Sequence, residues 1–122
     1  RSTLFPYTTL FRSSIISEKG LRPLYNHEII AEYKEVLSRP KFEFPTKAIA
    51  SILNKIQMSG MASYRVPSSG IFPDPKDVVF YEVAMSKEDA YLVTGNTKHF
   101  PKNTIVVTPS EMLEILQREG IL

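Results

Sequence analysis

The sequence predicts an α/β layered fold with a mostly parallel sheet. From Ser14 onward, segments with the period of amphipathic helices alternate with short apolar segments typical of buried strands. Such alternation is typical of folds in which helices cover a sheet whose strands run largely in one direction. The chain has 122 residues, the size of one domain, and neither an internal repeat nor a low-complexity linker divides it.

The first complete helix is predicted over residues 26–40, with Asn26 as the N-cap candidate and Pro40 as its stop. Before it, residues 14–20 (SIISEKG) have the character of the last turn of a helix, and residues 21–25 (LRPLY) that of a short strand. The apolar stripe of the predicted helix consists of Ile29, Ile30, Tyr33, Val36 and Leu37.

A second amphipathic helix is predicted over residues 46–60, and Gly60 lies just past its end. Its apolar face carries Ile49, Ile52, Leu53 and Ile56. A loop rich in Pro, Ser and Gly follows at 66–75. A strand is predicted at 62–66 and a buried helix at 75–87. Two further strands are predicted at 90–94 and 104–108, and a last helix with a T-x-x-E capping box at 108–120.

Composition excludes several classes of function. The absence of cysteine excludes disulfides, thiolate metal sites and a cysteine nucleophile, and it suits a reducing cytosol. No apolar run approaches the roughly 18 residues that cross a bilayer, so we expect a soluble, cytoplasmic protein with no membrane partner. A net charge of +2 is too mild to indicate a nucleic-acid face by itself. No glycine-rich phosphate-binding motif is present.

Three polar residues lie in loops or helix starts, where an α/β sheet places its ligands. Asp74 and Asp77 belong to the segment DPKD at the start of the predicted buried helix, where they could cap it or bind a cation. Asn96 follows a predicted strand that runs into Gly95. It could be a turn residue in a left-handed conformation, or an oxygen donor to a hard metal ion.

Glu32 lies on the flank of the first predicted helix, about 100° from the centre of its apolar stripe. A carboxylate at that angle can reach a cleft at the edge of the core. Glu28 and Glu35 lie farther round the helix, and we expect them to stay in solvent. His27 and His99 are too far apart in sequence to predict a metal pair.

Three segments resemble the PIN domains, and among these the toxin components of bacterial and archaeal toxin-antitoxin systems. They are EIIAEYKEVLSRPKF, DPKDVVFYEVAMSKEDAYLVTGNTKHFP and VVTPSEMLEIL, at 28–42, 74–101 and 106–116. The resemblance extends over residues 14–122 and implies a three-layer α/β/α fold. It also implies a ribonuclease that holds Mg²⁺ or Mn²⁺ in a cluster of carboxylates, with RNA as substrate, a cognate antitoxin as partner and homodimers common.

The resemblance also assigns roles to residues. Glu32 matches the helix glutamate of the family and Asp77 its central aspartate. Asn96 matches a position that is Asp in many members, and Asp74 is a supporting metal ligand. The resemblance therefore implies that Glu32, Asp77 and Asn96 are catalytic, and that all four residues bind the metal.

The start of the chain departs from the family pattern. The family's first aspartate lies in a D-[TS]-N-like motif at the end of a central strand, and this sequence has no such motif. Instead, RSTLFPYTTLFRS over residues 1–13 matches one reading frame of an adapter used in short-read sequencing libraries. We therefore expect 1–13 to be a non-native, adapter-derived segment with few native-like contacts. Residues 14–122 would then be an N-terminally truncated and inactive PIN domain that lacks its central strand.

If TTLF nevertheless occupies the central strand position, that alone would not make it native, because Thr, Leu and Phe are acceptable in strands. Two alternatives to the nuclease interpretation remain open. Asn96 in place of a carboxylate favours a non-catalytic PIN-like domain that binds RNA or an antitoxin. A receiver-type regulatory domain would need a phosphoacceptor Asp at a strand end, but two predicted strands end in Thr94 and Thr108.

Overall fold

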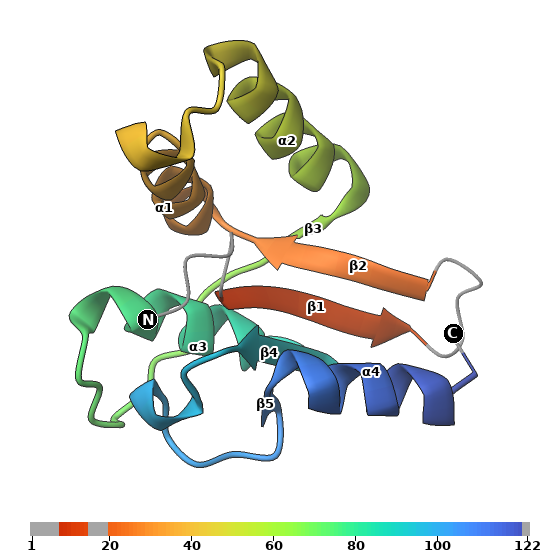
Figure 1. Cartoon of the computed structure of the whole chain (residues 1–122). Helices are drawn as coiled ribbons and strands as arrows, with labels where there is room; N and C mark the ends of the chain where they lie inside the picture. The colour runs from red at the N-terminus through yellow and green to blue at the C-terminus, as the bar shows by residue number, and fades with distance from the viewer. Residues whose placement is uncertain (1–7, 15–19, 121–122) are drawn as a thin grey trace.

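A five-stranded sheet forms the centre of the computed structural model, which describes residues 8–14 and 20–120 (Figure 1). The order of its strands is β3-β2-β1-β4-β5. Their bounds are Thr8–Ser14 for β1, Gly20–Tyr25 for β2, Met61–Ala62 for β3, Ala90–Thr94 for β4 and Val106–Val107 for β5.

Strand β1 runs against the direction of the other four. It pairs antiparallel with β2 and with β4, whereas β2 pairs parallel with β3 and β4 pairs parallel with β5. Thr8 is opposite Thr94 at one end, and Ser14 is opposite Gly20 at the other. The expected gap between 21–25 and 90–94 is therefore filled, and it is filled by a reversed strand.

In the described part of the chain, four helices surround the sheet: α1 His27–Leu37, α2 Thr46–Ser59, α3 Val78–Ala84 and α4 Pro109–Arg118. Three short 3₁₀ turns lie between them: η1 Pro40–Phe42, η2 Pro75–Asp77 and η3 Thr97–His99. Two predicted caps are confirmed. The Asn26 side chain accepts a hydrogen bond from the Ile29 amide at 2.8 Å, and Thr108 and Glu111 form the reciprocal capping box.

The alternation of side chains in β4 creates two cores on opposite faces of the sheet. Ala90 and Leu92 are buried on the side of α3, in the core that also includes apolar residues of α1, α2 and β2. Tyr91 and Val93 face the other way and pack against a smaller cluster on α4 and β5. These faces give the three layers that the sequence predicts, with the α1–α2 pair beside β2 (Figure 1).

Some elements differ from their predicted lengths. The strands predicted at 62–66 and 104–108 are reduced to two residues each, and the helix predicted at 75–87 divides into η2 and α3. Gly20, expected to close a helical turn, is the first residue of β2, while residues 15–19 lie outside the described part of the chain. Residues 1–7 of the adapter-like segment lie outside it as well. Within the described residues, no helix is long and apolar enough to span a membrane.

We expect Leu92→Ala to lower the free energy of unfolding by about 3 kcal/mol, because the Leu92 side chain is fully buried between β4 and α3. Leu113→Ala, on α4 with 53% of its surface exposed, is the matched control and should have a small effect. Urea denaturation followed by circular dichroism measures both. Equal losses in the two variants would contradict the placement of the core.

Candidate active site

The candidate site residues lie around one edge of the sheet. Strands β2 and β4 run in the same direction, since both are antiparallel to β1, so their carboxyl ends share an edge. Helix α1 follows β2 at this edge, and η3 follows β4. Helix α3 runs back from the same edge toward the start of β4. The topology thus brings the elements that carry Glu32, Asp77 and Asn96 to one edge of the sheet.

Asp74 and Asp77 have different roles in the structure. Asp74 caps η2, because its Oδ1 accepts a hydrogen bond from the Lys76 amide at 2.9 Å. Asp77 directly precedes α3, but its side chain makes no capping hydrogen bond. Its Oδ2 instead lies 3.4 Å from Nδ1 of His99, and only 13% of the Asp77 side chain is exposed. The capping interpretation therefore holds for Asp74 and fails for Asp77.

Asn96 is placed in the loop that leaves β4. Its amide donates to Oγ1 of the buried Thr94 at 3.1 Å, and its carbonyl accepts from the His99 amide at 3.0 Å. The φ angle of Asn96 is −126°, so the left-handed turn interpretation is wrong. His99 therefore contacts Asn96 through its backbone amide and Asp77 through its imidazole ring.

Glu32 lines a cleft between α1 and η2. The other lining residues are Glu28, Arg65, Pro75, Lys76 and Val79. The flank position inferred from helix geometry is therefore correct, since Glu32 faces a cleft lined by the segment that also carries the two aspartates. Glu32 makes no ion pair within 4.0 Å among the described residues.

Arg65 forms a bridge that sequence reasoning missed. Its Nε donates to Glu82 Oε1 at 2.7 Å, and its terminal nitrogen Nη1 donates to both carboxylate oxygens of Glu28 at 3.0 and 2.9 Å. The second oxygen of Glu82 accepts from the Ser68 amide at 2.7 Å. Glu82 is buried within α3. It is the one charged residue in the segment VVFYEVA, and a carboxylate in such an apolar segment indicates that a buried partner is needed.

Glu28 keeps 41% of its side chain exposed, and it also lines the Glu32 cleft and pairs with Arg65. Hydrogen bonds to Glu82 and then to Glu28 raise the pKa of Arg65, which keeps it charged at any physiological pH. Glu35 does remain exposed, and its hydrogen bonds from Arg39 lower its pKa. The loop of residues 63–68 is thereby tied both to α1 and to α3.

The structure brings the four candidates into two neighbouring groups. Glu32 faces the Pro75–Lys76 part of η2, while Asp77 contacts the η3 turn that follows Asn96. Nowhere in residues 8–14 and 20–120 do three His, Cys, Asp or Glu side chains form a group able to hold a metal ion. The described residues therefore supply oxygen donors at one edge of the sheet without a complete metal centre.

Comparison with known families decides the classification. The family model described as PIN domain matches residues 10–98, nearly three quarters of the chain. The chain belongs to the PIN domain family. No curated protein and no solved structure matches it.

PIN domains are generally nucleases and typically bind divalent metals. The PIN match includes Glu32, Asp74, Asp77 and Asn96, and it also includes residues 10–13 of the adapter-like segment. Helix α4 lies beyond the matched part.

We expect Glu82→Gln to lower the free energy of unfolding of this PIN domain by about 1–3 kcal/mol. A glutamine has one acceptor oxygen, so it cannot satisfy both the Arg65 guanidinium and the Ser68 amide. Glu35→Gln is the control, because its pair with Arg39 is exposed and should contribute little. Thermal and urea unfolding measure the stability of both variants. If both were as stable as the parent, the bridge would not contribute to the stability of the fold.

Proposed function

We propose that this PIN domain is a metal-dependent endoribonuclease and the toxin of a toxin-antitoxin system. Its reaction is the hydrolysis of RNA phosphodiester bonds with Mg²⁺ or Mn²⁺. The observation that carries the proposal is the position of Asp77, whose side chain is only 13% exposed, makes no capping hydrogen bond to α3 and lies 3.4 Å from Nδ1 of His99 in η3. Glu32 and Asn96 complete the catalytic set, and Asp74 is a supporting metal ligand. A cognate antitoxin is the proposed protein partner.

The candidate residues supply the type of ligand atom that the proposed metal ion requires. Carboxylate and amide oxygens are the ligands that Mg²⁺ and Mn²⁺ prefer, and Glu32, Asp74, Asp77 and Asn96 provide them. Asp74 is already engaged by the Lys76 amide, however, and the described residues do not group three acidic or histidine side chains. The described residues therefore supply suitable oxygen donors but do not form a complete site for the metal.

We propose further that residues 1–13 are adapter-derived and that the native domain has a different strand in the position of β1. Two observations support this. The segment resembles an adapter translation over its 13 residues, and β1 runs opposite to the four remaining strands of the sheet. A native strand in this position that ends at the carboxyl edge would bring a further carboxylate to Asp77 and Glu32.

A non-catalytic PIN-like domain that binds RNA or an antitoxin is the second candidate function. The neutral Asn96 favours it, since an amide in place of a carboxylate weakens attraction for a divalent cation. The incomplete donor group in the described residues favours it as well. Titration with Mn²⁺ separates the candidates, because a catalytic domain should bind the ion through Asp77 and a degenerate domain should not.

We expect the chain as printed to be inactive, and the protein encoded by the genomic DNA across Ser14 to cleave single-stranded RNA with Mg²⁺ or Mn²⁺. In the genomic protein, Asp77→Asn should abolish cleavage with little change in thermal unfolding, since the Asp77 side chain caps no helix. Glu114→Gln, on the exposed face of α4, is the control. Gel assays with and without EDTA measure cleavage. Full activity of Asp77→Asn, or cleavage that resists EDTA, would refute the metal-nuclease proposal.

A further inference from the structure

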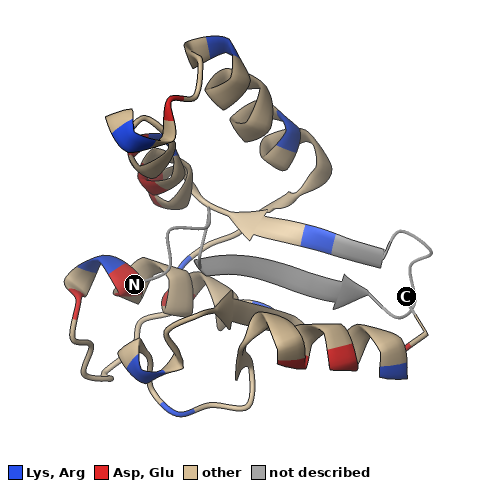
Figure 2. Cartoon of the chain, in the orientation of Figure 1, with Lys and Arg blue, Asp and Glu red and all other residues tan. Residues whose placement is uncertain are grey.

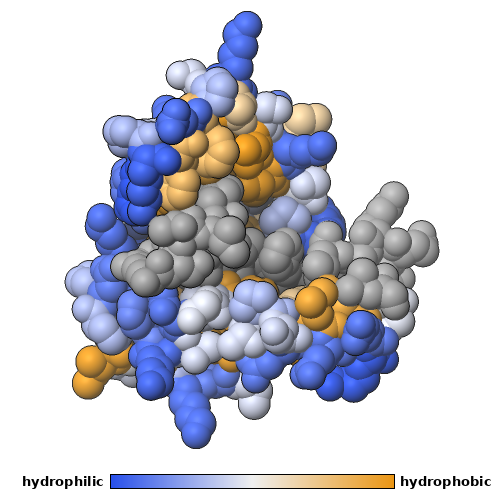
Figure 3. Space-filling view, in the orientation of Figure 1, coloured by the Kyte–Doolittle hydropathy of each residue, from blue (hydrophilic) through white to orange (hydrophobic). Residues whose placement is uncertain are grey.

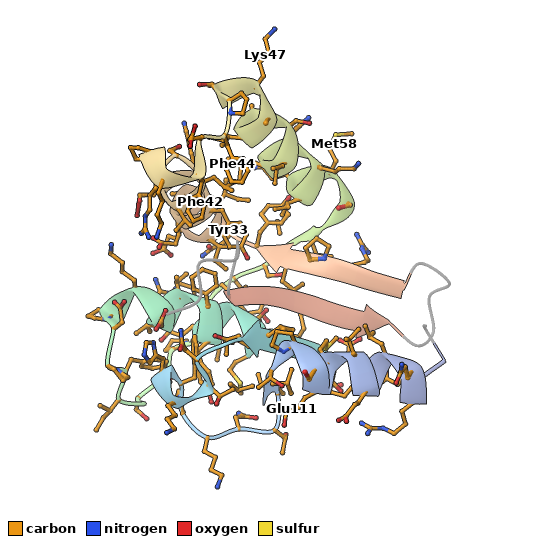
Figure 4. The ribbon with its side chains drawn as sticks, viewed as in Figure 1. Tyr33, Phe42, Phe44, Lys47, Met58 and Glu111 are labelled. Atoms are coloured by element: carbon orange, nitrogen blue, oxygen red, sulfur yellow. The ribbon has the colours of Figure 1, made fainter. Side chains whose placement is uncertain are left out.

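Two phenylalanine rings stack at the turn between α1 and α2. The ring centroids of Phe42 and Phe44 are 5.8 Å apart, and the ring planes differ by 13°. Nζ of Lys41 lies 5.2 Å from the centroid of Phe42. Phe44 is 42% exposed, and both rings lie between the two helices (Figure 4). The stack therefore ends in an accessible aromatic side chain.

The backbone holds the two rings in this arrangement. Glu43, the residue between them, has φ 54° and ψ 30°, a left-handed conformation that is uncommon outside glycine. The Glu43 amide donates to the Pro40 carbonyl at 3.1 Å, which fixes the turn. Pro40 and Pro45 further restrict the chain on either side. The ring pair is thus positioned by the turn rather than by deep burial in the core.

Positive charge is concentrated in the segment of the chain that carries these rings. We define the basic limb as residues 39–59, which comprise η1, α2 and the turn around them. The limb holds four basic residues and one acidic residue, for a net charge of +3, whereas the whole chain carries +2. Helix α2 contains two lysines and no acidic residue (Figure 2). The members of the basic limb that carry charge are Arg39, Lys41, Glu43, Lys47 and Lys55.

We propose that the basic limb binds single-stranded RNA, with one base stacked on Phe44 and with Lys41 and Lys47 next to the phosphates. This inference rests on the proposed function, because it describes how the substrate of that site is held. An exposed aromatic ring among cations is the combination that binds unpaired bases without sequence preference. The apolar surface of the limb is bordered by hydrophilic side chains (Figure 3).

The charge of the limb favours RNA over a protein partner. A protein interface at an apolar patch is typically depleted in lysine at its core, whereas Nζ of Lys41 lies over the ring of Phe42. Arg39 does not contribute freely, since Glu35 holds it through two hydrogen bonds. Glu43 is the one carboxylate of the limb, and its charge opposes phosphate binding. The positive charges available to phosphate are therefore those of Lys41 and of the lysines of α2.

The limb is close enough to the candidate active site for one strand to reach both. From Glu32 to Arg39 the chain advances seven residues, which is about two helical turns or roughly 10 Å. Helices α1 and α2 also pack against each other. A strand of a few nucleotides that stacks on Phe44 can therefore extend along α1 toward the Glu32 cleft.

The test uses a tryptophan reporter, because the chain contains no tryptophan. In the full chain, Phe44→Trp places a single fluorophore at the end of the stack, and Leu113→Trp places one on α4 as the matched control. The probe is a decamer of uridine in EDTA, so that no cleavage occurs. We expect saturable quenching of Phe44→Trp and none of Leu113→Trp, while a double-stranded RNA of equal length should quench neither.

Affinity measurements separate stacking from simple apolar contact. By fluorescence anisotropy of a labelled uridine decamer, Phe44→Leu should bind about tenfold more weakly than the parent, although leucine keeps an apolar side chain. Lys47→Gln with Lys55→Gln should reduce the salt dependence of binding. Met58→Ala, also exposed on α2, is the control. Circular dichroism checks that each variant is folded.

Two results would overturn the inference: an unquenched Phe44→Trp, or parent affinity in Phe44→Leu. The second would show that an apolar side chain at position 44 is sufficient, and that no base stacks on the aromatic ring. Failure of the proposed function has a different signature, because binding in EDTA would persist while the genomic protein produced no cleavage with Mg²⁺ or Mn²⁺. Cleavage by the genomic protein without quenching would refute only the role of the limb.

Discussion

The backbone pairing of β1 is the constraint on which the rest of the structure depends. β1 donates and accepts hydrogen bonds on both of its edges, toward β2 and toward β4, and the pairs β2–β3 and β4–β5 are joined through it. Without a strand in this position, the facing edges of β2 and β4 would carry unpaired polar groups inside the fold. Strands β2 and β4 share a direction, since both are antiparallel to β1, so the elements that carry Glu32, Asp77 and Asn96 leave the sheet at one edge. The central position thus determines both the stability of the sheet and the geometry of the site.

Local chemistry made most of the helices and strands predictable. Asn26 and Thr108 start helices through side-chain caps that depend only on the next three residues, and the strand at 90–94 is found at the predicted residues. The strands predicted at 62–66 and 104–108 are shorter, because pairing with a neighbour and not strand propensity decides how many residues enter a ladder. The direction of β1 could not be predicted, since residue alternation is the same for a strand read either way.

The position of a site residue was predictable where it depends on one helix or one cap. It was not predictable where it depends on contacts between segments distant in the sequence. The angle of Glu32 on its helix was enough to place it beside a cleft. The different roles of Asp74 and Asp77 depended on whether a side chain turns to its own backbone or to η3, which is a matter of tertiary contact. The Arg65 bridge joins residues 37 and 17 positions away in the chain, so no local pattern reveals it. The result is a cleft on α1 lined by two carboxylates and two cations, and a basic limb beyond the end of that helix.

The two cores on opposite faces of the sheet have a consequence for how the molecule opens. The cluster that holds α4 consists of Val107, Met112, Ile115 and Leu116, with Tyr91 and Val93 against it, and it shares no buried residue with the core around α3. A small separate cluster of this kind forms a cooperative unit with its own opening free energy. Detachment of α4 would uncover Tyr91 and Val93 while leaving the opposite face of β4 closed. Backbone amides of α4 should then exchange with solvent by sub-global opening, and those of α3 only by unfolding of the whole domain.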